Sequence, residues 1–279
     1  MTTDFTHTTL PVINKQVLRL GVAGNYGLDG NDIAHAASRG VNYWVWSPHM
    51  KKVTPALKEL LAAGRDRHVV AAFGIAYTAG MVRRQVRKSL KLLGSDHIDA
   101  YLLSWYGKMS FYTDSIQRTL QDLKQEGKVL ALGTSIHDRQ RAGELAADSI
   151  LDLLMIRYNA KHPGAEQDIF PHLHHRDPAV ICYTATSWRQ LLKPLKGIEM
   201  PPWPGDAAGN APPPLDASHC YRFCLGNPHV HVTLTGPKTR EQLDANLDVL
   251  EQGPLSAEEE QWVRDYGKKV KAKKRFGYF

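Results

Sequence analysis

The sequence lacks the features that mark several large classes of protein. Its 279 residues include only three cysteines, too few for a disulfide framework. No run approaches 18 apolar residues, and residues 1–9 have neither the basic start nor the apolar core of a signal peptide. No G-x-G-x-x-G, Walker loop or Ser-His-Asp signature is present. We therefore expect a cytoplasmic protein with no membrane association.

The net charge of +7 is concentrated in one place. Residues 264–275 hold seven Lys/Arg and one Asp, so this stretch carries +6 and the rest is close to neutral. A basic tail can contact phosphate or an acidic surface, but no nucleic-acid-binding motif accompanies it. A solvated last helix is the simpler interpretation, and a nucleic-acid partner is not expected.

Two clusters contain possible metal ligands, and neither has a convincing spacing. His172, His174 and His175 have only Asp177 nearby, and Cys220 and Cys224 lie one helical turn apart without a fourth ligand. Surface histidines and buried helix cysteines are the favoured interpretations, so no metal site is predicted.

Short apolar runs alternate with amphipathic segments along the chain. Eight strands are predicted, at 17–23, 41–46, 68–73, 98–103, 129–135, 151–156, 179–183 and 230–234. Helical periodicity follows nearly every strand, at 31–39, 55–63, 81–93, 113–125, 139–147, 218–225 and 239–250. Eight βα units in about 240 residues predict a single α/β domain over 1–279, a (β/α)₈ TIM barrel. A doubly wound open sheet is the second choice.

Three further segments complete this layout. Residues 1–16 form an N-terminal extension, and residues 197–214, rich in proline and glycine, form a long loop after strand seven. Ser256 and Glu259 form a capping box that begins an extra C-terminal helix, so 256–279 comprise this helix and the basic tail.

The strand at 41–46 ends in a polar turn, where an α/β enzyme places its chemistry. Ser47 and Pro48 stop the strand, and His49 follows. This end has no carboxylate, so a mechanism that needs one here is disfavoured.

An ordered set of motifs resembles the aldo-keto reductases. The motifs are GVNYW (40–44), GRDRHVV (64–70), DAYLLSW (99–105), GKVLALGTS (127–135), YN (158–159) and TGPKTREQLDANL (235–247). The resemblance implies a (β/α)₈ barrel that binds NADPH across its C-terminal mouth without a Rossmann domain. It also implies hydride transfer to a carbonyl. In that reaction a tyrosine donates the proton, a lysine oriented by an aspartate lowers the tyrosine pKa, and a histidine positions the substrate.

All four of those family positions are replaced in this sequence. Val45 stands at the aspartate, Met50 at the tyrosine, Gly74 at the lysine and Ser104 at the histidine. His49 and Tyr26 are therefore candidates for the acid, together with Tyr77 and Tyr106 after other strands, and Ser104 is a further catalytic candidate. Trp44, Trp46 and Trp105 could line an aromatic pocket, although strand tryptophans more often pack in a core.

The cofactor positions implied by the resemblance are better retained. Ser135 stands where the family holds the nicotinamide amide, although Ile136 and Met155 replace its neighbouring Asn and Gln, and Tyr183 stands where a ring stacks on nicotinamide. A helix start with basic residues suits a 2′-phosphate, so NADP(H) is favoured over NAD. The residues implied at that end are Gly236, Lys238, Thr239, Arg240, Gln242 and Asn246.

Three functional hypotheses remain open on the sequence. The leading one is an aldo-keto-reductase-like oxidoreductase that binds NADP(H), with atypical or impaired reduction of a small carbonyl substrate. The second is a cofactor-independent lyase, isomerase or hydrolase on the same barrel. The third is a non-catalytic, cofactor-sensing subunit. Neither the substrate nor the oligomeric state can be derived from the sequence.

Overall fold

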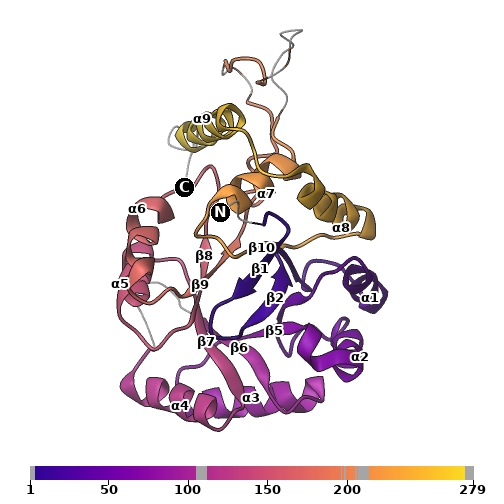
Figure 1. Ribbon diagram of the computed structural model, residues 1–279, viewed down its shortest axis with the longest axis vertical. Helices are drawn as coiled ribbons and strands as arrows, with labels where there is room; N and C mark the ends of the chain where they lie inside the picture. Colours follow the sequence, from indigo (N-terminus) through magenta and orange to yellow (C-terminus); the bar gives the residue numbers. More distant parts are fainter. Residues whose placement is uncertain are drawn as a thin grey trace.

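The computed structural model describes residues 4–104, 112–195, 197, 199–204, 206 and 214–273. Within these residues eight parallel strands close into a barrel in the order β10-β3-β4-β5-β6-β7-β8-β9. Figure 1 shows the helices arranged as a ring around the strands. The predicted (β/α)₈ fold is therefore confirmed.

The barrel strands are short and buried. They are β3 (Leu20–Ala23), β4 (Tyr43–Trp46), β5 (Val69–Gly74), β6 (Ile98–Ser104), β7 (Val129–Ile136), β8 (Leu153–Arg157), β9 (Ala179–Tyr183) and β10 (Val232–Thr235). The α-helices are α1 (Gly30–Ser38), α2 (Thr54–Gly64), α3 (Ala79–Leu93), α4 (Asp114–Gln125), α5 (Arg139–Ala147), α6 (Ala165–Asp168), α7 (Ala217–Gly226), α8 (Arg240–Leu247) and α9 (Ala257–Lys273). Three 3₁₀ segments, η1 (Arg65–Arg67), η2 (Phe170–His175) and η3 (Asp248–Gln252), complete the set.

Alternation along each strand separates two apolar clusters. In β4, Tyr43 and Val45 point into the barrel and belong to the interior cluster, whereas Trp44 and Trp46 belong to the cluster between strands and helices. Both tryptophans are fully buried. They are core residues and do not line a ligand pocket, because successive side chains of a strand face opposite sides.

An antiparallel hairpin closes the N-terminal end of the barrel. It consists of β1 (His7–Leu10) and β2 (Lys15–Leu18), and in Figure 1 it lies across the strands. Leu10, Ile13 and Val17 pack in the interior cluster. The expected strand at 17–23 is in fact the end of this hairpin followed by β3.

Helix ends follow their capping residues. The Asp29 side chain accepts hydrogen bonds from the first turn of α1. The capping box predicted before α9 is present, because the Ser256 N–H donates to Glu259 (2.8 Å) and the Glu259 N–H to Ser256 Oγ (3.2 Å).

The proline-rich loop is described only in part, since 198, 205 and 207–213 lie outside the described residues. Trp203 of this loop packs against Trp262 of α9, with ring centroids 5.0 Å apart, and against His219 of α7. Within the described residues no helix has both the length and the apolarity to span a membrane.

Candidate functional site

The carboxyl ends of the barrel strands form a mouth lined by the inward-facing position of each strand. Parallel strands of a barrel present these positions to one shared site. The period-2 alternation of the interior cluster identifies them as Ala23, Val45, Phe73, Ser104, Ser135, Arg157, Tyr183 and Leu234. These inward-facing side chains are apolar on β3, β4 and β5, whereas those on β6, β7, β8 and β9 are polar.

Val45 faces the mouth, as the resemblance implies for the aspartate position. Gly74 does not. A Cβ on Gly74 would meet the side chain of Gln85 and lie 2.9 Å from the Tyr101 hydroxyl, so this position points toward α3. The inward position at this end of β5 is Phe73, which packs against the interior cluster. A lysine would reach the mouth from residue 73, and the sequence-based assignment to Gly74 is off by one.

Met50 and His49 lie outside the ring of strand ends. Met50 packs against the cluster between barrel and helices. His49 is exposed and lines a cavity of about 330 Å³ beside β5 and α3. His49 is therefore at the rim of the mouth.

The other candidate acids occupy different places. Ser104 ends β6 next to Ser135 in the strand register and is half-buried. The ring of Tyr26 lies against Gly236, where a Cβ would collide with it, and it is 39% exposed. Tyr77 is exposed beyond β5, and Trp105 and Tyr106 lie outside the described residues.

Tyr183 and His137 form a polar pair at the mouth. The Tyr183 hydroxyl lies 2.8 Å from His137 Nδ1, and the two rings meet edge to face. Burial raises the pKa of Tyr183 to about 12, although the nearby positive charge of Arg157 opposes this. Partial desolvation and Arg157 lower the pKa of His137. The phenol is thus a hydrogen-bonding group that stays protonated at neutral pH.

Arg157 is the residue that the sequence reasoning missed. It pairs with Tyr183 in the β8–β9 register and is half-buried. Within the described residues its side chain has no hydrogen bond or ion pair. The signal was available, because Arg157 continues the alternation of the inward residues Leu153 and Met155. An unpaired guanidinium at this position can bind developing negative charge on a substrate oxygen.

The residues proposed for the far end of a dinucleotide lie after β10 and along α8, and several of them make hydrogen bonds within the chain. Lys238 is exposed, and its N–H donates to Gln242 Oε1 (3.0 Å). Thr239 caps the helix, whereas Arg240 donates to Asp32 Oδ1 (3.0 Å). Asn246 is buried and donates to Thr235 Oγ1 (2.8 Å). Asn246 therefore holds α8 against β10, which is a packing role.

Neither histidine nor cysteine clusters form a metal site in the described part of the chain. No group of three or more His, Cys, Asp or Glu is placed to hold an ion there. The rings of His174 and His175 contact each other, with centroids 3.9 Å apart. All three cysteines are free and buried, and burial raises their pKa.

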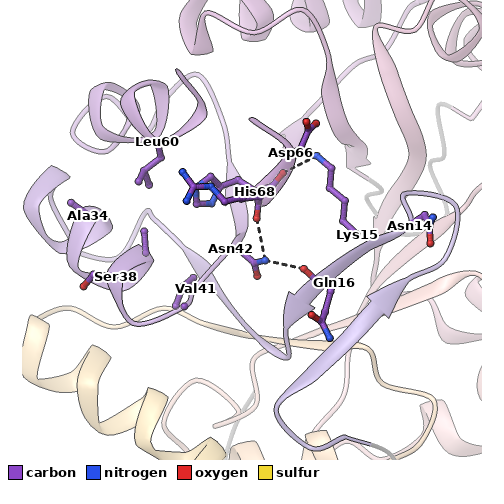
Figure 2. Close-up of a pocket in the computed structure, with 13 residues that line it drawn as sticks. Asn14, Lys15, Gln16, Ala34, Ser38, Val41, Asn42, Leu60, Asp66 and His68 are labelled. Carbon is purple, nitrogen blue, oxygen red and sulfur yellow. Dashed lines mark hydrogen bonds between the residues drawn. The ribbon is translucent and has the colours of Figure 1, made fainter. Parts of the chain in front are cut away.

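A larger cavity of about 790 Å³ lies at the opposite, N-terminal end, between the hairpin and helices α1 and α2. Figure 2 shows Asn42 between Gln16 of β2 and His68. The Asn42 side-chain amide donates to the backbone carbonyls of Gln16 (2.9 Å) and Arg67 (3.1 Å). Lys15 reaches the His68 carbonyl beside it. These contacts fasten the hairpin to the barrel, so the polar groups of this cavity are largely occupied.

Comparison with known proteins places the chain in a family. The family model "Aldo/keto reductase family" matches residues 33–196, more than half of the chain. An NADH-specific methylglyoxal reductase from Escherichia coli (strain K12) is 30% identical over 92 residues, which span 32% of this chain and 28% of that protein.

Solved structures agree on the fold. The holo form of an aldo-keto reductase from Bacillus halodurans superposes with a TM-score of 0.77 at 20% identity, covering 94% of this chain and 96% of that one. A glycerol dehydrogenase from Gluconobacter oxydans gives 0.73 at 20% identity, with 95% of both chains covered. An aldo/keto reductase from Klebsiella pneumoniae in complex with NADP and acetate gives 0.72 at 17%, covering 91% and 93%. The chain belongs to the aldo/keto reductase family.

Proposed function

We propose that this protein is an oxidoreductase that binds NADP(H) at the C-terminal mouth and reduces a small carbonyl compound by an atypical route. The observation that carries the proposal is the placement of Ser135 and Tyr183 on the inward face of β7 and β9, in the same mouth as Arg157. A hydroxyl for an amide, a ring for stacking and a cation for an oxyanion suit a nicotinamide reaction.

The residues present fit a dinucleotide best at its nicotinamide end. Ser135 is half-buried at the end of β7, and the Tyr183 ring contacts the interior cluster. At the other end Lys238 offers an exposed cation, but Arg240 is shared with Asp32. Arg240 would have to leave Asp32 to bind a 2′-phosphate, and the similar methylglyoxal reductase is NADH-specific, so NADPH and NADH are compared below.

In the proposed reaction the cofactor supplies the hydride, and the chain's own residues manage the developing alkoxide. The Arg157 guanidinium stabilises negative charge on the substrate oxygen. The Tyr183 hydroxyl, bonded to His137, holds a proton that can pass to that oxygen, with His137 as the connection to solvent. His49 at the rim is the alternative donor.

A second candidate is a protein that binds the cofactor without turning it over. Its specific support is that Val45 and Phe73, both apolar, occupy inward positions on neighbouring strands, and no carboxylate–lysine pair can form between them. In that case binding persists while carbonyl reduction is absent.

Calorimetric titration with NADPH and NADH tests the binding step. Tyr183→Ala should weaken binding about 5- to 10-fold through loss of ring stacking, whereas Tyr183→Phe should retain it. Asp32→Asn keeps an acceptor for the Asp29 N–H but frees Arg240, so it should shift the preference toward NADPH by a few fold.

Turnover is measured separately, by NADPH oxidation with methylglyoxal and a panel of aldehydes. Wild-type turnover that falls in Arg157→Gln supports the oxidoreductase. Binding without turnover favours the second candidate, and no binding of either dinucleotide at millimolar concentration overturns both.

A further inference from the structure

A second pocket opens beside the mouth, on its β4–β5 side. Its volume is about 330 Å³, and its walls come from the loop after β4, the end of β5 and helix α3. Phe73 lines this pocket and also packs in the barrel interior, so the pocket and the mouth share a wall. The pocket and the mouth are therefore adjacent, with the Phe73 ring between them.

The floor of this pocket is built from fixed polar contacts. Gln85 of α3 donates to the Ile75 carbonyl and accepts a hydrogen bond from the Tyr101 hydroxyl (2.7 Å). Tyr101 is 1% exposed. Gly74 leaves no space for a side chain here, because a Cβ would meet Gln85. Since both ends of the Gln85 amide are occupied, the floor is a preformed surface.

Two unpaired cations lie at the opening of this pocket. Arg84 and Lys88 are exposed and stand one turn apart on α3, and the exposed His49 lines the same pocket. Within the described residues neither Arg84 nor Lys88 makes a hydrogen bond or an ion pair, and no Asp or Glu lines the pocket there. The adjacent Arg83, by contrast, is paired with Asp122 and Glu126 at 2.8 Å each.

An anion bound between Arg84 and Lys88 would offset their mutual repulsion. Both side chains are exposed, and like charges at i and i+4 of a helix repel each other weakly. Side chains of this type bind carboxylate and phosphate oxygens in concave, partly desolvated sites.

We propose that this pocket is a subsite for an anionic group of the substrate, which makes the substrate an acidic carbonyl compound. Its carboxylate or phosphate lies between Arg84, Lys88 and His49, and its carbonyl lies in the mouth beyond Phe73. The inference rests on the proposed function for the identity of the reacting group, whereas anion binding in the pocket stands without it.

The test compares two aldehydes that differ in one charge, 4-carboxybenzaldehyde and methyl 4-formylbenzoate. The wild-type protein should prefer the acid in kcat/KM. In the double variant Arg84→Gln/Lys88→Gln the acid-to-ester ratio of kcat/KM should fall about 10-fold, as loss of charged hydrogen bonds predicts. Glutamine keeps the helix intact, because it is a good helix former.

The matched control is Arg87→Gln, an exposed cation of α3 that does not line the pocket. It removes one positive charge from the same helix, so it should leave the acid-to-ester ratio at the wild-type value. An equal fall of the ratio in this control would mean that the overall positive charge of the helix causes the preference, and it would overturn the subsite.

A binding experiment without cofactor separates this inference from the proposed function. Saturation-transfer NMR should detect 4-carboxybenzaldehyde on the wild-type protein and lose the signal in the double variant. Retained binding with no turnover of either aldehyde contradicts the reductase but supports the subsite. Turnover of both aldehydes with no preference for the acid supports the reductase and overturns the subsite.

Discussion

The two ends of the barrel differ in whether their buried or half-buried charged groups have partners. At the N-terminal end the Asp99 carboxylate is fully buried and accepts hydrogen bonds from Lys15, Arg65 and the Val70 N–H, each at 2.8 Å. At the mouth Arg157 is half-buried with no such partner among the described residues. Charges that are satisfied hold the hairpin and strands together, and a charge left unsatisfied is available to a ligand.

Removing the buried Asp99 carboxylate should give the largest loss of stability. Asp99→Asn leaves Lys15 and Arg65 facing an uncharged amide, so the free energy of unfolding should fall by about 3 kcal/mol. Urea denaturation measures it. Asp122→Asn, an exposed partner of Arg83, is the control and should cost less than about 1 kcal/mol. Equal losses in the two variants would remove the distinction between the ends.

A second test introduces a carboxylate and a lysine at the mouth and asks whether they can pair there. Val45→Asp buries a carboxylate at a 7% exposed position and should destabilise the fold by about 2 kcal/mol. Adding Phe73→Lys should recover about 1 kcal/mol or more in a double-mutant cycle, because both side chains face inward. Val45→Asp with Gly74→Lys should recover nothing, since residue 74 points to Gln85. Recovery in that second pair would restore the assignment of the lysine position to Gly74.

The unpaired cation of the mouth should matter little for stability. Arg157→Gln should change the free energy of unfolding by less than about 0.5 kcal/mol. Because Arg157 lowers the pKa of His137, the same variant should raise that pKa, which NMR titration of the imidazole reports. A large loss of stability would mean that Arg157 is a structural residue like Asp99.

A final prediction concerns the loss of stability in acid through His162. Burial first, then Arg157 and Lys161, lower the pKa of His162 from 6.5 to about 4. Between these values the unfolded chain binds a proton that the folded chain does not, so stability falls as the pH falls through this window. His162→Asn should therefore lose less stability than wild type between pH 7 and 5 in urea titrations. An identical pH dependence in both proteins would contradict the assignment.

The fold could be predicted from the sequence because the alternation of short apolar runs and amphipathic segments specifies it locally. The strand at 179–183 and the helix at 139–147 were predicted with the bounds that the structure shows. The hairpin was missed because residues 17–23 read as one apolar run. The chain divides at Arg19, whose buried guanidinium donates to the carbonyls of Leu225 and Val230. Those partners lie more than 200 residues away, so no local pattern contains them.

The site was less predictable for a related reason. Choosing between Phe73 and Gly74 requires the strand's orientation, which the barrel sets through its neighbours. Whether Arg157 has a partner for its guanidinium, and whether Arg240 pairs with Asp32, depends on side chains from other elements. The candidates at Ser135 and Tyr183 remain predictions, which the titrations above test.

Closure of the barrel by β3 and β10 also has a consequence for how the chain folds. These strands pair from Leu20–Thr233 to Val22–Thr235, so the first barrel strand obtains its last neighbour only after nearly the whole chain has been synthesised. Contacts of such long sequence separation slow folding. Until then β3 and the Arg19 side chain lack their final partners on the nascent chain. We expect the closing seam to form late, and substitutions there to change the refolding rate less than the unfolding rate.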